Sequence, residues 1–180
     1  MARPSLRSAT RADAPTVAEI YAHHVLNGTA TFDIDPPKAD HWADKIEQIG
    51  QRRWPFLIAE HQATVIGYAY ATQFRDRPAY AATCENSIYL APDWVGQGVG
   101  ALLLAHLLDA AAACRFTQMI GVIGVIGGGE PASVALHRKL GFVEAGRMRN
   151  VGQKFGRMLD TVYMQRALAQ PQGRGIGGRW

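Results

Sequence analysis

The sequence predicts one α+β domain in which a mixed sheet carries helices on both faces. The chain has 180 residues, of which 48% are hydrophobic and 19% charged, enough for one well-buried core and too few for two ordinary domains. Helical segments come first and a run of strands follows them, which is not the strict alternation of a doubly wound sheet. A glycine-rich turn then joins a strand to a long helix, a layout typical of phosphate binding.

The first part of the chain reads as two helices after a short strand. Leu6 to Ala9 is the possible strand, and Asp13 can cap the helix that follows it. Asn27-Gly28 ends this helix, and a second one is expected from Asp40 to Gly50. Apolar residues fall at helical spacing in both segments: Val17, Ile20, Tyr21 and Val25 in the first, and Trp42, Ile46 and Ile49 in the second.

The middle of the chain is rich in strand-forming residues. Pro55 to Glu60 and Thr64 to Phe74 predict an antiparallel hairpin across the polar link His61-Gln62-Ala63. A turn around Asp76-Arg77-Pro78 leads to a third strand, from Thr83 to Leu90.

Helices and strands then follow one another to the end of the domain. We expect the domain to span residues 1–168 and residues 169–180 to form a flexible tail rich in Gly and Arg. The remaining elements are a helix from Ala101 to Cys114, a strand from Thr117 to Ile126, a loop at Gly127-Gly128-Gly129, a helix from Pro131 to Leu140 and a last strand from Met158 to Arg166.

Composition and charge exclude several classes of function. The chain has no run of about 18 apolar residues and no apolar signal core at its start, so we expect a cytoplasmic protein without a membrane partner. Cys84 and Cys114 have no Cys or His neighbours at metal-ligand spacing, so we expect no metal. The net charge is +4, but no dense Lys/Arg cluster with interleaved aromatic residues indicates a nucleic-acid partner.

The turn Gly96-Gln97-Gly98-Val99-Gly100 is suited to an anion. Closely spaced glycines let the backbone approach an oxygen, and the following helix adds the positive end of its dipole. A dinucleotide-binding fingerprint would need a third glycine where Leu103 stands, and a Walker loop would need Gly-Lys-Ser/Thr where Gly100 precedes Ala101. The turn therefore either binds another phosphate-bearing ligand or is only a tight connection.

The order strand, glycine turn, helix, strand, and then the helix that ends in Leu140-Gly141-Phe142 resembles the cofactor-binding half of the GNAT superfamily of N-acetyltransferases. From about Ser5 to Leu168 the chain resembles the phosphinothricin and methionine-sulfoximine N-acetyltransferase group. This resemblance implies a central mixed, mostly antiparallel twisted sheet, acetyl-CoA as the acetyl donor, and a homodimer. The matching stretches are Thr31-Phe32, Arg77 to Tyr80, Glu85 to Tyr89, Val125 to Gly127, Ser133 to Gly141 and Arg149 to Asp160.

The resemblance also implies which residues hold acetyl-CoA. Its pantetheine arm would lie beside the strand from Asn86 to Leu90 like an extra strand. Two positions depart from the family pattern: Val95 replaces a Gln or Arg at the start of the turn, and Glu130 replaces a common Asn. Main-chain N–H groups hold the pyrophosphate, so the change at Val95 is expected to be tolerated. The implied cofactor residues are Ile88, Tyr89, Leu90, Gly96, Gln97, Gly98, Val99, Gly100, Ala101, Glu130 and Ser133.

Acetyl transfer to an amine requires a base, a polarised carbonyl and a proton for the departing thiolate. Glu85 lies in an otherwise apolar and small strand, where burial would raise its pKa towards that of a useful base, and the resemblance implies that role for it. Glu85 could instead be a carboxylate at the rim that pairs with Arg or Lys. His137 stands where much of the superfamily has a tyrosine that protonates the thiolate, and it either takes part in proton transfer or only fills space.

The acceptor is implied to be a small-molecule amine. The resemblance places Phe32, Arg77, Tyr80 and Lys154 around its pocket, with the two cations facing the anionic group of an amino-acid analogue. Arg77 and Lys154 could equally be ordinary surface charges. The sequence therefore predicts acetyl transfer from acetyl-CoA to the α-amine of a phosphinothricin, methionine sulfoximine or methionine sulfone type of acceptor. The alternatives are acetylation of a protein N-terminus or polyamine, and a non-catalytic acyl-CoA sensor.

Overall fold

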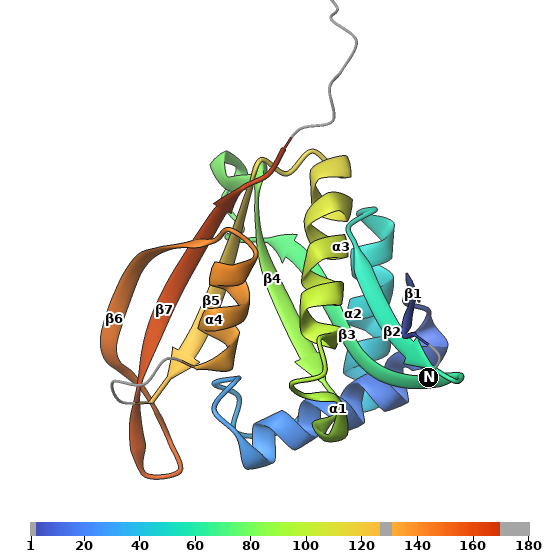
Figure 1. The fold of residues 1–180 in the computed structure, drawn as a ribbon, viewed down its shortest axis with the longest axis horizontal. Coiled ribbons are helices and arrows are strands. Elements are labelled where there is room, and N and C mark those ends of the chain that lie inside the picture. The colour runs from blue at the N-terminus through green and yellow to red at the C-terminus, as the bar shows by residue number, and fades with distance from the viewer. Residues whose placement is uncertain (1–2, 127–130, 170–180) are drawn as a thin grey trace, which may run out of the picture.

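The computed structural model describes residues 3–126 and 131–169, and these form one sheet with helices on both faces (Figure 1). Within these described residues the strand order is β1-β2-β3-β4-β5-β7-β6, and only β4 and β5 pair in parallel. The predicted mixed, mostly antiparallel sheet is thus confirmed. The strands are β1 (Ser5–Ser8), β2 (Phe56–His61), β3 (Thr64–Gln73), β4 (Thr83–Leu90), β5 (Gln118–Val125), β6 (Val143–Lys154) and β7 (Arg157–Ala167).

The described helices lie close to where the sequence places them. The α-helices are α1 (Ala14–Asn27), α2 (Ala39–Gln51), α3 (Val99–Ala113) and α4 (Ala132–Lys139), and the short 3-10 helices are η1 (Arg11–Asp13), η2 (Pro78–Tyr80) and η3 (Pro92–Trp94). None of these helices is long and apolar enough to cross a bilayer.

Alternation along the central strands builds two cores, one on each face of the sheet. Phe56 and Tyr68 belong to a core cluster with α1 and α2 that contains Trp42. Ala59, whose side chain points to the other face of the sheet, belongs to the cluster packed against α3. Figure 1 shows α3 and α4 on the near side of the sheet and α2 on the far side. The predicted coverage of both faces is confirmed.

β4 and β5 separate after Asn86. Their parallel pairing runs from Thr83↔Gln118 to Asn86↔Gly121, although β4 continues to Leu90 and β5 to Val125. On its other side β4 stays paired with β3 as far as Leu90. We call the diverging ends, Ser87–Leu90 and Val122–Val125, the fork; within the described chain no strand fills it.

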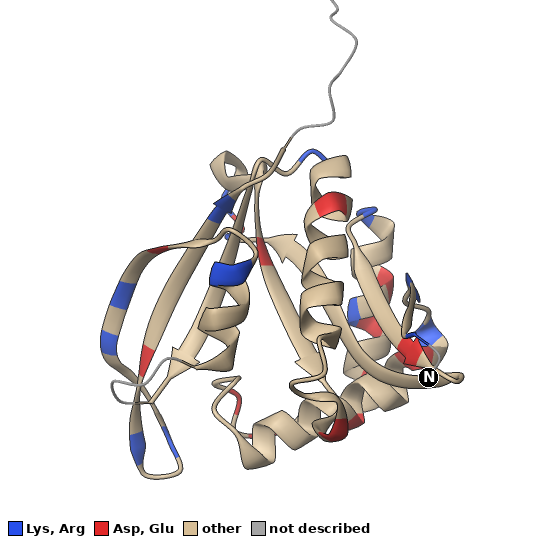
Figure 2. Ribbon diagram, in the orientation of Figure 1, with Lys and Arg blue, Asp and Glu red and all other residues tan. Residues whose placement is uncertain are grey.

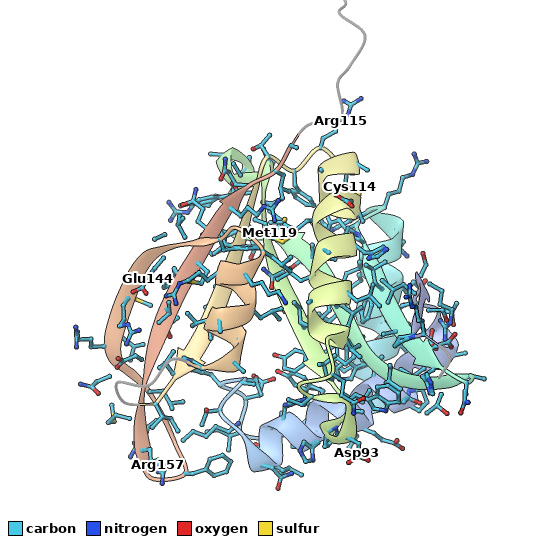
Figure 3. The ribbon with its side chains drawn as sticks, in the orientation of Figure 1. Asp93, Cys114, Arg115, Met119, Glu144 and Arg157 are labelled. Atoms are coloured by element: carbon cyan, nitrogen blue, oxygen red, sulfur yellow. The ribbon has the colours of Figure 1, made fainter. Side chains whose placement is uncertain are left out.

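Two local expectations need correction. Asp13 precedes α1 but makes no side-chain capping hydrogen bond to it. Its carboxylate instead accepts hydrogen bonds from the Thr10 N–H and from the Arg7 guanidinium. β6 was not predicted from the sequence; it forms a hairpin with β7. Arg157, the first residue of β7, is labelled in Figure 3 near the turn of this hairpin. The expected loop at 127–129 and nearly all of the expected tail lie outside the described residues.

Candidate active site

The fork presents main-chain groups of β4. The N–H of Ala91 donates to the Ile66 carbonyl of β3 at 2.9 Å. Main-chain groups of successive residues in a strand point to alternate sides, so those of Ile88 and Leu90 point into the fork. The Nε2 of His24 donates to the Leu90 carbonyl at 2.8 Å, which fixes the end of β4 to α1. The predicted main-chain positions thus face an open edge.

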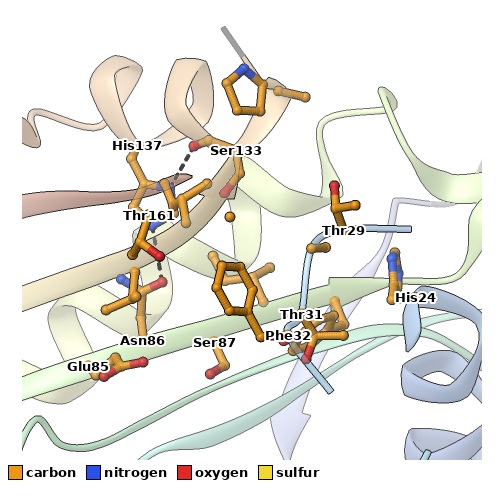
Figure 4. A pocket seen from close by; sticks show the side chains of 18 of the residues that line it. His24, Thr29, Thr31, Phe32, Glu85, Asn86, Ser87, Ser133, His137 and Thr161 are labelled. Atoms are coloured by element: carbon orange, nitrogen blue, oxygen red, sulfur yellow. Dashed lines mark hydrogen bonds between the residues drawn. The ribbon is translucent and has the colours of Figure 1, made fainter. Parts of the chain in front are cut away.

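A cavity of about 610 Å³ occupies the fork and extends beneath the loop after α1 (Figure 4). In this view Glu85 and His24 lie at opposite ends, with the ring of Phe32 between them. Predicted residues in its wall come from β4, α4 and the loop after α1: Phe32, Glu85, Ile88, Tyr89, Ser133 and His137. Its other residues are His24, Thr29, Ala30, Thr31, Asn86, Ser87, Val95, Val122, Ile123, Gly124, Pro131, Ala132 and Thr161.

Glu85 is half-buried on β4 at one end of the cavity. Burial raises the pKa of its carboxyl above the ordinary value, and the positive charges of Arg75 and Lys45 oppose that rise. In the described structure no salt bridge to Glu85 is formed. A half-buried carboxylate without a close counter-ion, facing a cavity, has the properties of a general base.

His137 is buried, and each of its ring nitrogens lies near an oxygen atom, although a neutral ring can donate to only one of them. Its Nδ1 donates to the Ser133 carbonyl at 2.7 Å, and its Nε2 lies 3.1 Å from Oδ1 of Asn86. Burial lowers its pKa, against the effect of the Ser133 hydrogen bond. Gly121 makes room for the ring, because a Cβ there would lie 2.7 Å from Nε2. His137 therefore joins α4 to the base of the fork.

The glycine turn adjoins the cavity at the start of α3. Gly98 is the N-cap of α3 with φ +84°, and no atom of the described residues lies within 4 Å of where its Cβ would be. Gly100 has an ordinary φ but packs against α4, since a Cβ there would lie 3.3 Å from Leu136. The turn therefore needs glycine at position 98 for its backbone and at position 100 for packing, and it leaves open space before the N-terminus of a 15-residue helix.

The predicted acceptor residues do not come together. Phe32 lines the cavity, but Arg77 and Tyr80 lie at the exposed η2 helix, outside its wall. Lys154 is buried and lines a second cavity, of about 270 Å³. Glu130 lies outside the described residues. Of the four predicted acceptor contacts, the structure thus places one in the cavity wall.

Sequence reasoning missed several residues of this site. His24 lines the cavity and donates to the Leu90 carbonyl, but it was not among the predicted site residues. Asn86, beside Glu85 in the sequence, reaches His137 through the opposite face of β4. Of the positive charges that oppose the rise in the pKa of Glu85, that of Arg75 has the largest effect. Strand alternation was the available signal for Asn86, whereas His24 becomes visible only when α1 is packed on β4.

Two further features bear on the site: where the basic side chains lie, and how the possible metal-ligand side chains are placed. Figure 2 shows Lys and Arg spread over the N-terminal elements, α4, β6 and β7. Among residues 3–126 and 131–169, no group of three or more His, Cys, Asp or Glu side chains is placed to hold a metal ion.

Comparison with known proteins identifies the family. Residues 6–163 match the acetyltransferase (GNAT) domain family. The chain is 44% identical over 156 residues to a phosphinothricin N-acetyltransferase of Alcaligenes faecalis, covering 87% of this chain and 78% of the relative. It is 38% identical over 165 residues to an L-methionine sulfoximine/L-methionine sulfone acetyltransferase of Pseudomonas aeruginosa, covering 89% and 92%. A crystal structure of a phosphinothricin acetyltransferase from Sinorhizobium meliloti in complex with acetyl-CoA matches with a TM-score of 0.86 at 44% identity, covering 98% of this chain and 92% of that one. The chain therefore belongs to the GNAT acetyltransferase family.

Proposed function

We propose that this protein is an acetyl-CoA-dependent N-acetyltransferase that acetylates the α-amine of a small amino-acid analogue of the phosphinothricin, methionine sulfoximine or methionine sulfone type. One observation carries the proposal: a single cavity joins the open edge of β4 to the half-buried Glu85. The names of the relatives support the donor and the class of acceptor.

The fork and the start of α3 fit the two ends of the donor. The N–H groups of Ile88 and Leu90 point into the fork, where a pantetheine arm can pair with them as a strand does. The left-handed Gly98 and the helix N-terminus leave open space for the pyrophosphate. Acetyl-CoA supplies the thioester; the chain binds it and polarises its carbonyl through main-chain N–H groups.

Glu85 is the proposed general base, and it accepts a proton from the acceptor's ammonium or amine, directly or through water. Transfer is direct, in a complex with both substrates. Burial raises the pKa of the Cys84 thiol to about 12, so this cysteine is poorly suited to carry an acetyl group. In the resting geometry Nε2 of His137 lies against Oδ1 of Asn86, so His137 can meet a thiolate only by leaving that position.

The acceptor would enter at the Glu85 end of the cavity, beside Phe32. Arg77 and Tyr80 lie just before β4, the strand that carries Glu85, and they are proposed to meet the acceptor's anionic group there. The positive charge of Arg77 at this entrance would disfavour polyamines, which are themselves cationic.

The test is a panel of amines with acetyl-CoA, scored by thiol release and by mass of the product. Carboxylated amino-acid analogues should be acetylated with the highest kcat/KM, ahead of spermidine and of a peptide with a free N-terminus. Arg77→Ala should lower kcat/KM for the carboxylated acceptors by about tenfold or more, as the loss of a charge-assisted hydrogen bond does. Thiol release with the peptide or the polyamine alone would overturn the proposed class of acceptor. No thiol release with any amine would favour a non-catalytic acyl-CoA sensor.

A homodimer is also proposed, and exposed apolar side chains on the β6–β7 hairpin support it. Val143, Met148, Val151, Phe155 and Met158 are each more than 40% exposed. Such a surface favours association. Light scattering should give twice the chain mass, and Phe155→Glu should weaken the dimer. Cytoplasmic location and the lack of a nucleic-acid or membrane partner stay predictions from the sequence.

A further inference from the structure

Lys154, at the end of β6, lies apart from the cavity in which the acceptor is proposed to bind. Its side chain is 6% exposed, and its Nζ donates to the Thr31 carbonyl at 3.1 Å. It lines the second cavity with Val25, Leu26 and Ile34. Burial lowers the pKa of the ammonium, and the nearby Asp33 carboxylate opposes this. The ammonium thus binds the backbone of the loop after α1 and does not face the active-site cavity.

Thr31 is also held from its side chain. Its hydroxyl lies 2.6 Å from the Tyr21 hydroxyl, and the Tyr21 hydroxyl donates to the Asp33 carboxylate at 2.7 Å. The Asp33 N–H donates to the Thr31 hydroxyl in turn. Lys154 and Tyr21 therefore fix the backbone and the side chain of one residue, and this residue precedes Phe32.

Two glycines form a slot for the Phe32 ring. A Cβ on Gly124 of β5 would lie 2.8 Å from Cε1 of the ring, and a Cβ on Gly152 of β6 would overlap the ring near Cε2. Neither glycine has a positive φ, so the ring, and not the backbone conformation, excludes a side chain there. The ring is still 43% exposed and forms part of the cavity wall.

We propose that Lys154 is a positioning residue that sets the acceptor wall by holding the Thr31 carbonyl, so that Phe32 stays in the slot between Gly124 and Gly152. The hydrogen bond joins β6 to the loop, across 123 positions of the sequence. The slot is built from Gly152 on the same strand and from Gly124 on β5, which lies on the other side of β7. Lys154 acts through Phe32 and makes no contact with the acceptor's anionic group. This inference rests on the proposed function only for the identity of the acceptor.

The kinetic test compares Lys154→Met, Phe32→Ala and the double variant, with Lys139→Met on exposed α4 as the matched control. Lys154→Met should raise the KM of methionine sulfone about tenfold, as expected for the loss of a charged hydrogen bond, with little change in the KM of acetyl-CoA. In the Phe32→Ala background the same substitution should add almost nothing, because both changes act on one wall. The increase should be the same for the carboxamide of the acceptor.

Direct recognition of the acceptor predicts otherwise. If Lys154 bound the acceptor's carboxylate, the KM increase would persist without Phe32 and would vanish for the carboxamide. Either result would overturn the positioning role.

Hydrogen exchange tests the same inference without turnover. The backbone amides of residues 28–33 should exchange faster in Lys154→Met than in Lys139→Met, because the loop has lost an anchor. Gly152→Ala should also speed exchange there by displacing the ring. If no acceptor in the panel is acetylated, the proposed function fails, and the exchange measurement still decides the role of Lys154; unchanged exchange in both variants would sink it.

Discussion

The Nε2 of His137 lies 3.1 Å from Oδ1 of Asn86, where α4 meets β4 at the start of the fork. The Asn86 amide nitrogen donates to the Ile120 carbonyl at 3.2 Å, which turns its oxygen towards the ring. Nδ1 donates to the Ser133 carbonyl, so a neutral ring carries no N–H on Nε2, and only a protonated ring can donate to both oxygen atoms. The residue that the family pattern places as a proton donor thus lies packed between α4 and β4 in this geometry.

His137→Ala should therefore act first on stability. It leaves the Ser133 carbonyl without its donor and removes a buried ring packed against Gly121, so the free energy of unfolding should fall by about 1 to 3 kcal/mol. Activity should drop at every pH with the shape of the rate profile kept. Thermal unfolding and the pH dependence of kcat measure the two effects. Loss of the alkaline limb at unchanged stability would instead identify His137 as the proton donor.

Gly98→Val should weaken the binding of acetyl-CoA. At φ +84° a β-branched residue is strained, and its side chain would enter the open space before α3. The KM of acetyl-CoA should rise by an order of magnitude or more while the acceptor KM changes little. Gly156→Val is the matched control, because Gly156 also has a positive φ, +70°, with no atom within 4 Å, but lies in the β6–β7 turn. Equal effects of both variants on acetyl-CoA would contradict the assignment.

The sequence was sufficient to predict the elements with strong local patterns. Strand β4 matches its predicted bounds, and α1 to α4 match within about two residues because their apolar spacing or glycine boundaries are local. β6 was missed because nearly all of it is exposed, so no alternation marks it, and two irregularities interrupt its pairing with β7. An edge strand of this kind forms through its pairing with the neighbouring strand, here β7, and not through a pattern in its own sequence.

The candidate site could be predicted only in part, for a related reason. Glu85 was found from its place in an apolar strand, and the cavity contains it. The contact between Asn86 and His137 joins residues 51 positions apart, and that of Lys154 with Thr31 joins residues 123 apart. A family resemblance indicates which residues are shared but not which side of a loop a long side chain occupies. Lys154 was therefore assigned to the wall of a cavity that it does not line.

Asp13 gives stability that depends on pH. Its hydrogen bonds with Arg7, at 2.6 and 2.8 Å, hold the pKa of its carboxyl down at about 2. A folded-state pKa below the unfolded value contributes stability above about pH 4, and this is lost as the pH falls through 2. Asp13→Asn should lower the free energy of unfolding by about 1 to 3 kcal/mol at pH 7. Denaturation from pH 7 to pH 2 should show the difference shrinking, and exposed Asp109→Asn should show none.

Glu85→Gln should abolish base catalysis. The kcat should fall by about 10²- to 10⁴-fold, the range for loss of a general base, while acetyl-CoA binding stays intact. Since burial raises the pKa of Glu85, the wild-type acidic limb should lie above the pH at which an ordinary glutamate titrates, and the variant should lack that limb. Exposed Glu19→Gln is the control. Most of the activity surviving at neutral pH would show that another group or bulk water takes the proton.

Arg75 tunes that base without being part of the cavity wall. The positive charges of Arg75 and Lys45 both oppose the rise in the pKa of Glu85, and Arg75 has the larger effect. Removing a nearby cation makes the carboxylate less favourable, so Arg75→Ala should move the acidic limb of kcat/KM to higher pH, and Lys45→Met should move it less. Arg115, just after the C-cap of α3, is not among the charges that shift the pKa of Glu85, so Arg115→Ala should leave the limb in place. High salt should reduce the shift, because screening weakens exposed charges. A limb that moves to lower pH, or stays fixed in Arg75→Ala while Glu85→Gln removes it, would show that the field of Arg75 does not reach the base.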